Sequence, residues 1–372
     1  MATVRDGMPH FDLYQPDSVE DALALLDRLG RGAHMDGGTD GPLRAWVLAG
    51  GLDCLERFKD RIRHPSAVVD LARVGALRGV RREGDETVIG PMTTLAEVAR
   101  HPDIRERFGL LAEAAAQVAS PQIRNQGTLG GNLSQDARCW YYRDGWPCYR
   151  AGGNICYAAA PGAMNREHAV FGARRCVAVS PSDTAPALVA LEARLVIRNA
   201  ARTRMVAAED YFLGPETDIT RLTVLEPDDL LVEIRIPPTW AGTRFHFEKV
   251  RDRPVWDFSL ASVAAAMRQT GDRIDQARLV LGSVAARPWR LPQVEAALAG
   301  RPREEAADAA DLAVRGAVPL AHNGYKVTLA RNLARRAILG QPPGAPSLAM
   351  GASGLMGAPD PSPARQTGKE AS

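Results

Sequence analysis

Apolar positions recur with a helical period in some stretches of the chain and with a strand period in others. Residues 17–26 have a polar start followed by apolar residues at helical spacing, which predicts a capped helix that ends near Gly30. Residues 80–91 alternate around a Gly84-Asp85 turn, a pattern typical of a β-hairpin. Short apolar runs predict further strands at 45–49, 67–71 and 194–198. The mixture of periods predicts a chain with both helices and sheets.

Two helices are predicted between this hairpin and residue 121. One begins near Thr93-Thr94, where a threonine is a suitable N-cap. The other is alanine-rich, covers 110–120 and is predicted to end at Pro121.

The pattern is interrupted within 211–222 by Gly214 and Pro215, and we place a domain boundary there. Beyond it, strands are predicted at 230–236, 245–250, 260–266 and 276–282, and the chain is then predicted to be helical up to Gly340. The last residues, 341–372, are mostly Pro, Gly, Ser and Ala with little to bury, which predicts a disordered tail.

Composition and charge exclude several classes of partner. The chain has 372 residues, enough for two or three domains, with 45% apolar and 24% charged residues. The net charge of +2 and the lack of a single-sign run give no reason to expect nucleic acid or an anionic membrane. No apolar run approaches the roughly 18–20 residues of a membrane span, and the N-terminus does not resemble a secretory signal. We therefore expect a cytoplasmic protein, or one exported together with a signal-bearing partner.

Two glycine-rich segments are candidates for binding a phosphate group. In the first, an apolar strand runs into Gly50-Gly51 and a helix begins near Asp53, which places backbone N–H groups at a helix N-terminus. In the second, Thr128 and Asn132 flank a pair of glycines whose successive N–H groups can form an anion-binding nest. The first segment alone is equally compatible with an ordinary strand-to-helix turn. Together the two segments predict a phosphate-bearing cofactor.

Four of the five cysteines lie within 38 residues, at spacings of 9, 8 and 20. Such clustering is typical of metal ligands, although the CxxC pairs that make zinc sites easy to identify are missing. From spacing alone, an iron–sulfur cluster and a structural zinc site are equally supported, and plain buried cysteines remain an alternative.

Several motifs occur in an order that resembles the FAD-binding subunits of the molybdenum hydroxylases, a family that includes xanthine dehydrogenase, carbon monoxide dehydrogenase and aldehyde oxidoreductases. The resemblance extends from Pro16 to Leu339. The motifs are VLAGGLD at 47–53, IGPMTT at 89–94, GTLGGN at 127–132, SPSD at 180–183, Lys249 followed by Asp257-Phe258, and LGSVA at 281–285.

The resemblance implies an α+β fold with a two-lobed FAD-binding domain of the vanillyl-alcohol-oxidase/PCMH type. The small lobe would comprise about 1–65 and the large lobe about 66–215, followed by a C-terminal domain of antiparallel sheet plus helices over 216–340. Both glycine segments would hold the pyrophosphate of FAD. Their residues are Val47, Leu48, Ala49, Gly50, Gly51, Leu52, Asp53 and Cys54 in the first segment, and Thr128, Leu129, Gly130, Gly131 and Asn132 in the second.

The resemblance also implies three further contacts to FAD. Asp183 would hold the ribityl or flavin side, and Leu231 and Lys249 would lie beside the isoalloxazine. A lysine cation near the flavin would stabilise the reduced anion and raise its potential. From the sequence alone, a solvated lysine on a strand is an equal alternative. Cys54, outside the cysteine cluster, is expected to be a small core residue.

A 47-residue insertion, 133–179, separates the second glycine segment from the SPSD motif and contains the clustered cysteines. It resembles the branch of the family with the flavin subunits of 4-hydroxybenzoyl-CoA reductase and of a bacterial aldehyde oxidoreductase, where the insertion holds an additional [4Fe–4S] cluster. The resemblance favours this cluster over zinc, with Cys139, Cys148, Cys156 and Cys176 as ligands. Nearby aromatic residues are expected to exclude water from it: Trp140, Tyr141, Tyr142, Trp146 and Tyr149. For His168 we expect a satisfied structural histidine rather than a group that orients a thiolate or the flavin.

The resemblance implies an electron-transfer subunit without catalytic residues of its own. Its partners would be a large subunit with the molybdenum cofactor, a small subunit with [2Fe–2S] centres, and an external electron acceptor, with aldehydes or related aromatic or heterocyclic substrates oxidised on the partner. Two alternatives stay open. The same subunit can feed low-potential electrons to an aromatic-CoA reductase, or the chain can be a stand-alone flavoprotein oxidase with a zinc-stapled loop.

Overall fold

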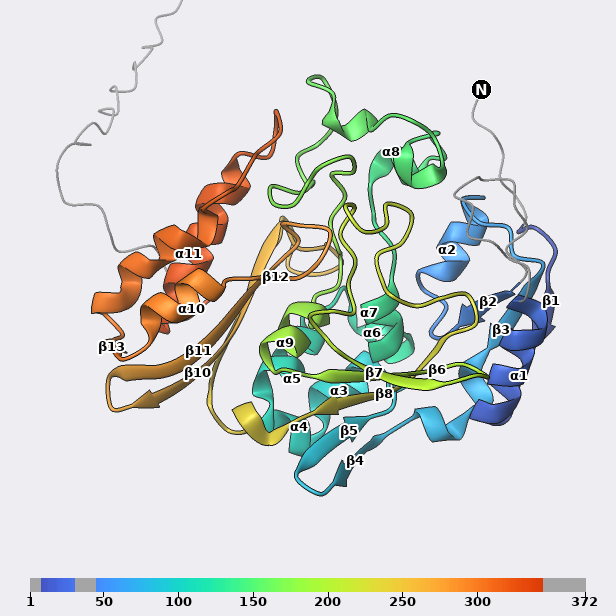
Figure 1. The fold of residues 1–372 in the computed structure, drawn as a ribbon, viewed down its shortest axis with the longest axis horizontal. Coiled ribbons are helices and arrows are strands. Elements are labelled where there is room, and N and C mark those ends of the chain that lie inside the picture. The colour runs from blue at the N-terminus through green and yellow to red at the C-terminus, as the bar shows by residue number, and fades with distance from the viewer. Residues whose placement is uncertain (1–7, 31–44, 344–372) are drawn as a thin grey trace, which may run out of the picture.

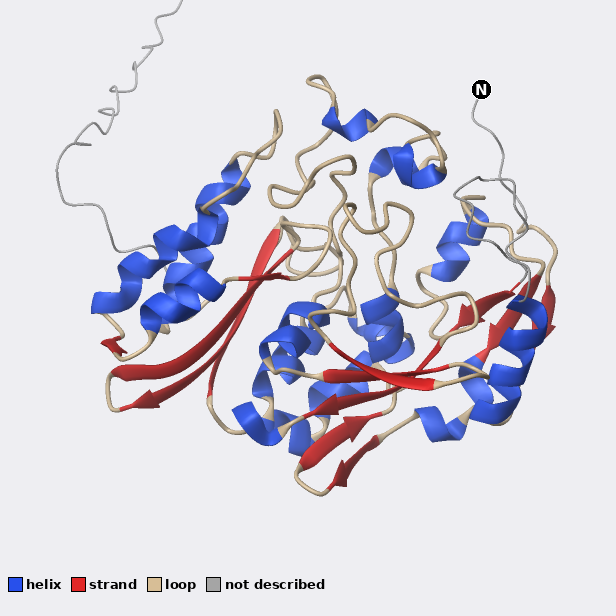
Figure 2. Cartoon of the chain, viewed as in Figure 1, coloured by secondary structure: helices blue, strands red, loops and turns tan. Residues whose placement is uncertain are grey.

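The computed structural model describes residues 8–30 and 45–343, which form three β-sheets with helices packed around them (Figure 1). Figure 2 shows that long loops cover one end of the molecule, whereas the sheets and most helices lie at the other end. Of the predicted tail, residues 344–372 lie outside the described residues. Among the described helices, none is long and apolar enough to cross a membrane.

The first sheet is small and parallel, with strand order β1-β3-β2. Its strands are β1 (Asp12–Tyr14), β2 (Ala45–Leu48) and β3 (Ala67–Asp70). Helix α1 (Val19–Gly30) packs on this sheet through Ala22, Leu23 and Leu26, and helix α2 (Cys54–Lys59) follows β2. The predicted capped helix is confirmed, because the Ser18 hydroxyl accepts the backbone N–H of Asp21 at 3.0 Å.

The second sheet is antiparallel, with strand order β4-β5-β8-β6-β7. Its strands are β4 (Val80–Glu83), β5 (Glu86–Ile89), β6 (Arg194–Arg198), β7 (Thr203–Ala207) and β8 (Leu230–Ile236). The predicted hairpin and the strand at 194–198 are confirmed. The helices around this sheet are α3 (Leu95–Arg100), α4 (Pro102–Arg107), α5 (Gly109–Ala116), α6 (Pro121–Gln126), α7 (Leu129–Ser134) and α9 (Thr184–Ala190). Apolar side chains of the strands and helices share one core.

Strand β8 shows that the domain boundary predicted at residue 215 is wrong. Ile234 of β8 pairs with Ile89 of β5 and with Leu195 of β6, which makes β8 the middle strand of the second sheet. The boundary therefore falls between Ile236, where β8 ends, and Arg244, where the next sheet begins. The apolar alternation of 230–236 indicates a strand but carries no information about the sheet that the strand joins.

The third sheet is antiparallel, with strand order β12-β11-β10-β9 and β13 paired to β11. Its strands are β9 (Arg244–Val250), β10 (Ala261–Thr270), β11 (Arg273–Gly282), β12 (Trp289–Arg290) and β13 (Arg301–Pro302). The other helices of this part are α10 (Pro292–Leu298), α11 (Tyr325–Leu339) and the 3₁₀ helix η6 (Glu305–Val314). The region predicted to be helical up to Gly340 thus also contains two short strands.

Alternate residues of β10 face two different cores. Val263, Ala265 and Met267 pack with α10, α11 and η6, whereas Ala264 and Ala266 pack in the core of the second sheet. Because side chains of a strand alternate between its faces and both faces are buried, the sequence of β10 is a continuous apolar run. The third sheet therefore joins the two halves of the molecule.

The start of α3 and the end of α5 can be compared with the boundaries predicted from the sequence. Thr94 caps α3 in a capping box with Glu97, as expected for an N-cap threonine. Pro121 does not end the alanine-rich helix, because α5 already ends at Ala116 and Pro121 occupies the first turn of α6. Proline lacks the N–H that would be unsatisfied in a first turn, so it starts a helix as readily as it ends one.

The insertion, 133–179, contains little regular structure (Figure 2). It holds the four-residue helix α8 (Trp140–Arg143) and two 3₁₀ turns, η3 (Tyr149–Ala151) and η4 (Tyr157–Ala159). Its backbone returns to the body of the protein at Val170, whose N–H donates to the Val284 carbonyl at 2.9 Å. Other 3₁₀ turns of the described residues are η1 (Leu71–Arg73), η2 (Gly75–Leu77) and η5 (Pro238–Trp240).

Candidate functional site

A cavity of about 580 Å³ is lined by residues from all three sheets, among them Val47 of β2, Leu231 of β8 and Lys249 of β9. This volume lies within the roughly 300–1,000 Å³ typical of cofactor pockets. Fourteen of the sixteen residues predicted to bind the cofactor line the cavity, and Leu48 and Leu129 do not. Leu48 packs with Phe58, and Leu129 is fully buried in the core around α5.

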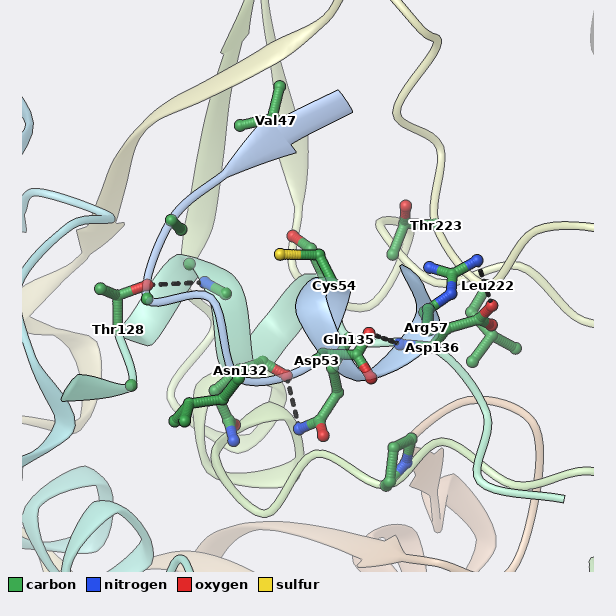
Figure 3. Close-up of a pocket in the computed structure, with 18 of the residues that line it drawn as sticks. Val47, Asp53, Cys54, Arg57, Thr128, Asn132, Gln135, Asp136, Leu222 and Thr223 are labelled. Carbon is green, nitrogen blue, oxygen red and sulfur yellow. Dashed lines mark hydrogen bonds and ion pairs between the residues drawn. The ribbon is translucent and has the colours of Figure 1, made fainter. Parts of the chain in front are cut away.

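The first glycine segment connects β2 to α2 along the cavity wall (Figure 3). Gly51 has a φ of +78°, a conformation that costs glycine little. Gly50 is required for a different reason. A Cβ at this position would lie 2.4 Å from the carbonyl oxygen of Gln126, which precedes the second glycine segment. Gly50 therefore allows the two glycine segments to lie side by side.

The second glycine segment forms the first turn of α7 rather than an irregular nest. The Thr128 hydroxyl accepts the backbone N–H of Gly131 at 3.1 Å and so caps the helix. A Cβ at Gly130 would lie 2.6 Å from the Cβ of Pro91. Packing against Pro91 therefore requires that residue 130 have no side chain, and a ligand in the cavity would require the same.

Asn132 ties the second glycine segment to the SPSD motif. Its side-chain oxygen accepts hydrogen bonds from the hydroxyls of Ser182 and Thr184, each at 2.7 Å. These residues flank Asp183, the N-cap residue of α9. The conformation of the motif is therefore fixed by α7.

Asp183 and Lys249 form a buried ion pair at the cavity. The Lys249 Nζ donates to Asp183 Oδ2 at 2.6 Å and to the Gln117 carbonyl at 3.1 Å. The side chain of Lys249 is 1% exposed, which shows that the alternative of a solvated strand lysine is wrong. Burial raises the pKa of Asp183, although the Lys249 ammonium opposes that shift. The second carboxylate oxygen, Oδ1, is buried and has no hydrogen-bond partner among the described residues.

Asp53 of the first glycine segment faces the insertion. Its carboxylate accepts from the guanidinium of Arg143 at 2.7 Å and from the backbone N–H of Asp136 at 3.0 Å, and it pairs with Arg138 at 3.0 Å. Asp53 lines the cavity, but its carboxylate is already engaged by the protein. It therefore connects the cavity wall to the insertion.

A buried charge cluster centred on Asp136 lies where the insertion meets α2. Asp136 pairs with Arg57 at 2.9 Å (Figure 3). It also pairs with Arg150 and accepts the Tyr142 hydroxyl at 2.9 Å. Burial alone would raise the pKa of Asp136, but the guanidiniums of Arg150, Arg57 and Arg143 hold it well below its usual range. The carboxylate is therefore ionised, with two buried guanidiniums directly beside it.

The sequence did not reveal several groups that line the cavity. They include Arg57, Gln135, Asp136, Arg138 and Arg150, together with 220–223 and Trp256. The arginines pair with acids up to 90 residues away, as Arg143 does with Asp53, and no local pattern reports such pairs. The other residues belong to loops, where spacing carries no signal.

The four clustered cysteines are gathered in one region of the insertion. Cys139 and Cys176 pack against the same apolar residues, among them Ala137 and Leu222, and Cys139 and Cys148 pack around Tyr142. Burial raises the pKa of Cys139 to about 12. Burial also raises the pKa of Cys176, which Arg150 opposes and the nearby Cys156 and Cys148 reinforce. The raised pKa values favour the protonated thiols of Cys139 and Cys176.

The remaining cysteine and the aromatic residues differ in part from expectation. Cys54 is buried against Phe58, as expected of a small core residue, and burial together with Asp53 raises its pKa to about 12. Tyr142 is 1% exposed, but Trp140 is 59% and Trp146 is 42% exposed. The expectation that both tryptophans shield the cysteines from water is therefore wrong, because α8 directs Trp140 outward.

His168 does more than fill the structural role expected of it. Its Nε2 lies 3.2 Å from the sulfur of Cys139, and its Nδ1 has no hydrogen-bond partner among the described residues. Burial, followed by the charge of Lys326, lowers the pKa of His168 to about 4.

Comparisons with known proteins agree with this architecture. A family model described as the FAD binding domain in molybdopterin dehydrogenase matches residues 9–239, and one described as the CO dehydrogenase flavoprotein C-terminal domain matches residues 245–340. The carbon monoxide dehydrogenase medium chain of Hydrogenophaga pseudoflava is 30% identical over 337 residues, which cover 89% of this chain and 96% of the relative. The aldehyde oxidoreductase FAD-binding subunit PaoB of Escherichia coli (strain K12) is 33% identical over 291 residues, covering 77% of this chain and 88% of PaoB.

The fold agrees as well. A chain in the structure of the carbon monoxide dehydrogenase from Hydrogenophaga pseudoflava that lacks the Mo-pyranopterin moiety superposes with a TM-score of 0.68 at 31% identity, over 89% of this chain and 97% of that one. The protein therefore belongs to the FAD-binding subunits of the molybdopterin dehydrogenase family.

Proposed function

We propose that this chain is the FAD-binding electron-transfer subunit of a molybdenum hydroxylase complex and that its insertion also holds a [4Fe–4S] cluster. The observation that carries the FAD part is the cavity between the two glycine segments, which is lined by fourteen of the sixteen residues predicted to bind the cofactor. Asp183 is one of them, and its buried Oδ1 has no hydrogen-bond partner among the described residues, which costs roughly 1–3 kcal/mol. When bound, FAD supplies two-electron chemistry and the cluster supplies one-electron transfer.

Residues of the chain have distinct roles in this proposal. The backbones of Gly51 and Gly131 leave room for the pyrophosphate, and Leu231 offers an apolar surface to the flavin. Lys249 holds the Asp183 carboxylate in position through their 2.6 Å contact, and its charge opposes the rise in the pKa of Asp183 that burial causes. Because this ammonium is already paired, its effect on the flavin potential is smaller than that of the free cation expected from the sequence.

The donor set of the insertion fits an iron–sulfur cluster. Cys139, Cys148, Cys156 and Cys176 are near one another, and Cys148 is buried. Among the described residues, no three His, Cys, Asp or Glu side chains lie close enough to hold a single metal ion. Four thiolates are the ligand set of a [4Fe–4S] cluster. The preference for the cluster over a zinc-stapled loop therefore rests on the resemblance of the insertion, 133–179, to the branch of the family that carries such a cluster.

The partners follow from the family. We propose a large subunit with the molybdenum cofactor, on which the substrate is oxidised, a small subunit with [2Fe–2S] centres, and an external electron acceptor. The relatives' names, carbon monoxide dehydrogenase medium chain and aldehyde oxidoreductase FAD-binding subunit, support a chain of this type, and the second supports an aldehyde as substrate. The alternative, a complex similar to 4-hydroxybenzoyl-CoA reductase, requires centres of much lower potential.

The test is an absorption and EPR spectrum, with metal, sulfide and flavin analysis, of the full chain purified without oxygen together with its partners. We expect a flavin spectrum, broad iron–sulfur absorption and no zinc. Zinc in place of iron, with oxidase activity in the isolated chain, would establish the stand-alone oxidase instead. Flavin and cluster potentials low enough to reduce an aromatic ring would establish the reductase alternative.

A further inference from the structure

The imidazole of His168 is held directly against one of the proposed cluster ligands. The residue is 4% exposed, and its Nε2 lies 3.2 Å from Cys139 Sγ, within the range of a hydrogen bond to sulfur. A cysteine bound to iron is a thiolate and has no proton to donate. With iron bound, Nε2 would therefore be the donor in this contact and the sulfur the acceptor.

The surroundings of the ring support the same tautomer. The Nδ1 atom is buried and has no hydrogen-bond partner among the described residues. A proton on Nδ1 would leave a buried N–H unsatisfied, whereas a proton on Nε2 is used in the contact to Cys139.

Two fully buried asparagines fix the backbone around His168. The N–H of His168 donates to the Asn165 carbonyl at 3.2 Å. The Asn323 side-chain amide donates to the carbonyls of His168 and Ala169 at 3.0 and 3.1 Å. Asn323 lies two residues before the start of α11, so the position of the imidazole is set by the C-terminal domain and not by the insertion alone.

Lys326 adds a second connection to the same segment. It is fully buried in the first turn of α11, and its Nζ donates to the carbonyls of Glu167 and Ser283, each at 2.8 Å. Asn165 also accepts the backbone N–H of His322 at 3.0 Å through its side-chain oxygen. Hydrogen bonds on both sides of His168 thus hold the segment that carries the imidazole. A histidine that is buried by packing alone does not need such bonds.

We propose that His168 is a positioning residue that donates a hydrogen bond to the Cys139 thiolate and thereby raises the reduction potential of the proposed cluster. The inference rests on the proposed function, because it presupposes iron at the cysteines. A donor to a ligand sulfur stabilises the more negative, reduced form of the cluster, and such hydrogen bonds are among the determinants of cluster potentials.

The experiment begins with iron and sulfide analysis of the wild-type chain, purified without oxygen with its partners. Absence of iron there would overturn the proposed cluster itself, before any variant is considered. With the cluster present, EPR-monitored redox titration compares wild type with His168→Leu and His168→Gln. We expect His168→Leu to keep its iron and sulfide but to show a ratio of reduced to oxidised cluster about tenfold lower at a fixed potential, a shift of about 59 mV for a one-electron couple. His168→Gln, which retains a donor near Nε2, should recover most of this shift.

Matched variants at Asn323, two residues before α11, and at Tyr325, in the first turn of α11, separate positioning from general packing. Asn323→Ala is expected to lower the potential in the same direction by a smaller amount. Tyr325→Phe removes an exposed hydrogen bond from the same helix to the Arg166 carbonyl, 3.1 Å long, and should leave the potential unchanged. An unchanged potential in a His168→Leu protein that keeps its cluster would overturn the proposal.

A measurement on the wild-type chain covers the case in which His168→Leu loses the cluster. Electron-nuclear double resonance of the reduced protein, labelled with ¹⁵N-histidine, should show one weakly coupled histidine nitrogen. A strong coupling would make His168 an iron ligand, and the lack of any coupling would remove it from the site. Either result would overturn the proposal.

Discussion

The cavity and the insertion lie side by side but are built in different ways. Much of the cavity wall is formed by the ends of regular elements, namely β2, α2, α7, α9, β8 and β9, each of which is anchored in an apolar core, and residues of the insertion and of loops line the rest. The insertion has little regular structure and is fixed by ion pairs and by backbone hydrogen bonds to distant elements. Shape at the cavity depends on packing, whereas shape at the insertion depends on polar groups that each need a particular partner.

The difference implies different sensitivities to mutation. An apolar core distributes its stabilisation over many contacts, so a site on its edge tolerates most single changes. A buried charge cluster concentrates its stabilisation in a few groups, because removing one partner leaves the others charged and without compensation.

The largest effect is expected at the centre of the charge cluster. Asp136→Ala leaves the buried guanidiniums of Arg57 and Arg150 without their carboxylate, which should lower the free energy of unfolding by about 3–5 kcal/mol. Chemical denaturation measures the loss. Asp144→Ala, which removes an exposed acid of the same insertion, is the control and should change stability by less than about 0.5 kcal/mol. Equal losses in both variants would show that the insertion is not organised around Asp136.

At the cavity, a single substitution is expected to act through packing and not through charge. Gly50→Ala places a Cβ 2.4 Å from the Gln126 carbonyl oxygen, which should separate the glycine segments, cost about 1–3 kcal/mol and release flavin. Gly130→Val should also release flavin, because its Cβ would meet Pro91 at 2.6 Å. Flavin content after gel filtration measures both effects. Gly75→Ala, where a Cβ meets nothing within 4 Å, is the control; full flavin occupancy in Gly50→Ala would contradict the placement of the segments.

Lys326, which links the insertion to α11, leads us to predict that the stability of the protein depends on pH. Burial lowers the pKa of Lys326 to about 7 in the folded protein, below the usual lysine value of about 10.4. Between these two values the unfolded chain binds a proton that the folded chain does not, so this group makes stability rise with pH, by about 1 kcal/mol per pH unit. Below pH 7 its effect is constant.

Denaturation curves at pH 7 to 9.5 test this slope. The stability of wild type relative to Lys326→Met should increase with pH, whereas exposed Lys59→Met should follow wild type throughout. A difference that does not vary with pH would mean that Lys326 keeps its charge when buried.

A further effect, confined to cofactor affinity, is expected at Asp183, an acid that lines the cavity. Asp183→Asn removes the negative charge of the carboxylate, and loss of a charge-assisted hydrogen bond of about 1.5–3 kcal/mol should weaken flavin binding at least tenfold. Fluorescence titration of flavin-free protein measures the affinity. Asp257→Asn is the control, since Asp257 also lines the cavity but bonds Arg253 at an exposed site. Equal affinities in wild type and Asp183→Asn would remove Asp183 from the cofactor site.

The difference between the cavity and the insertion also explains which features could be predicted from the sequence. Features with a local signal were predicted: the capped helix α1, the hairpin β4–β5, the Thr94 cap and the two glycine segments. The sheet that β8 joins was not, because a strand's pattern specifies which face is buried but not its neighbours. The pairs of Asp136 with Arg57 and of Asp53 with Arg143 were also missed, since charged residues look alike whether they are solvated or buried.

The most direct test of the two-site account is the content of FAD, iron and acid-labile sulfide in Cys148→Ser compared with wild type, both purified without oxygen together with the partner chains. The account predicts that Cys148→Ser loses iron and sulfide in equal amounts and keeps its FAD, because the cavity is built from elements that do not depend on the cysteines. Loss of FAD together with the iron, or retention of all the iron, would contradict it.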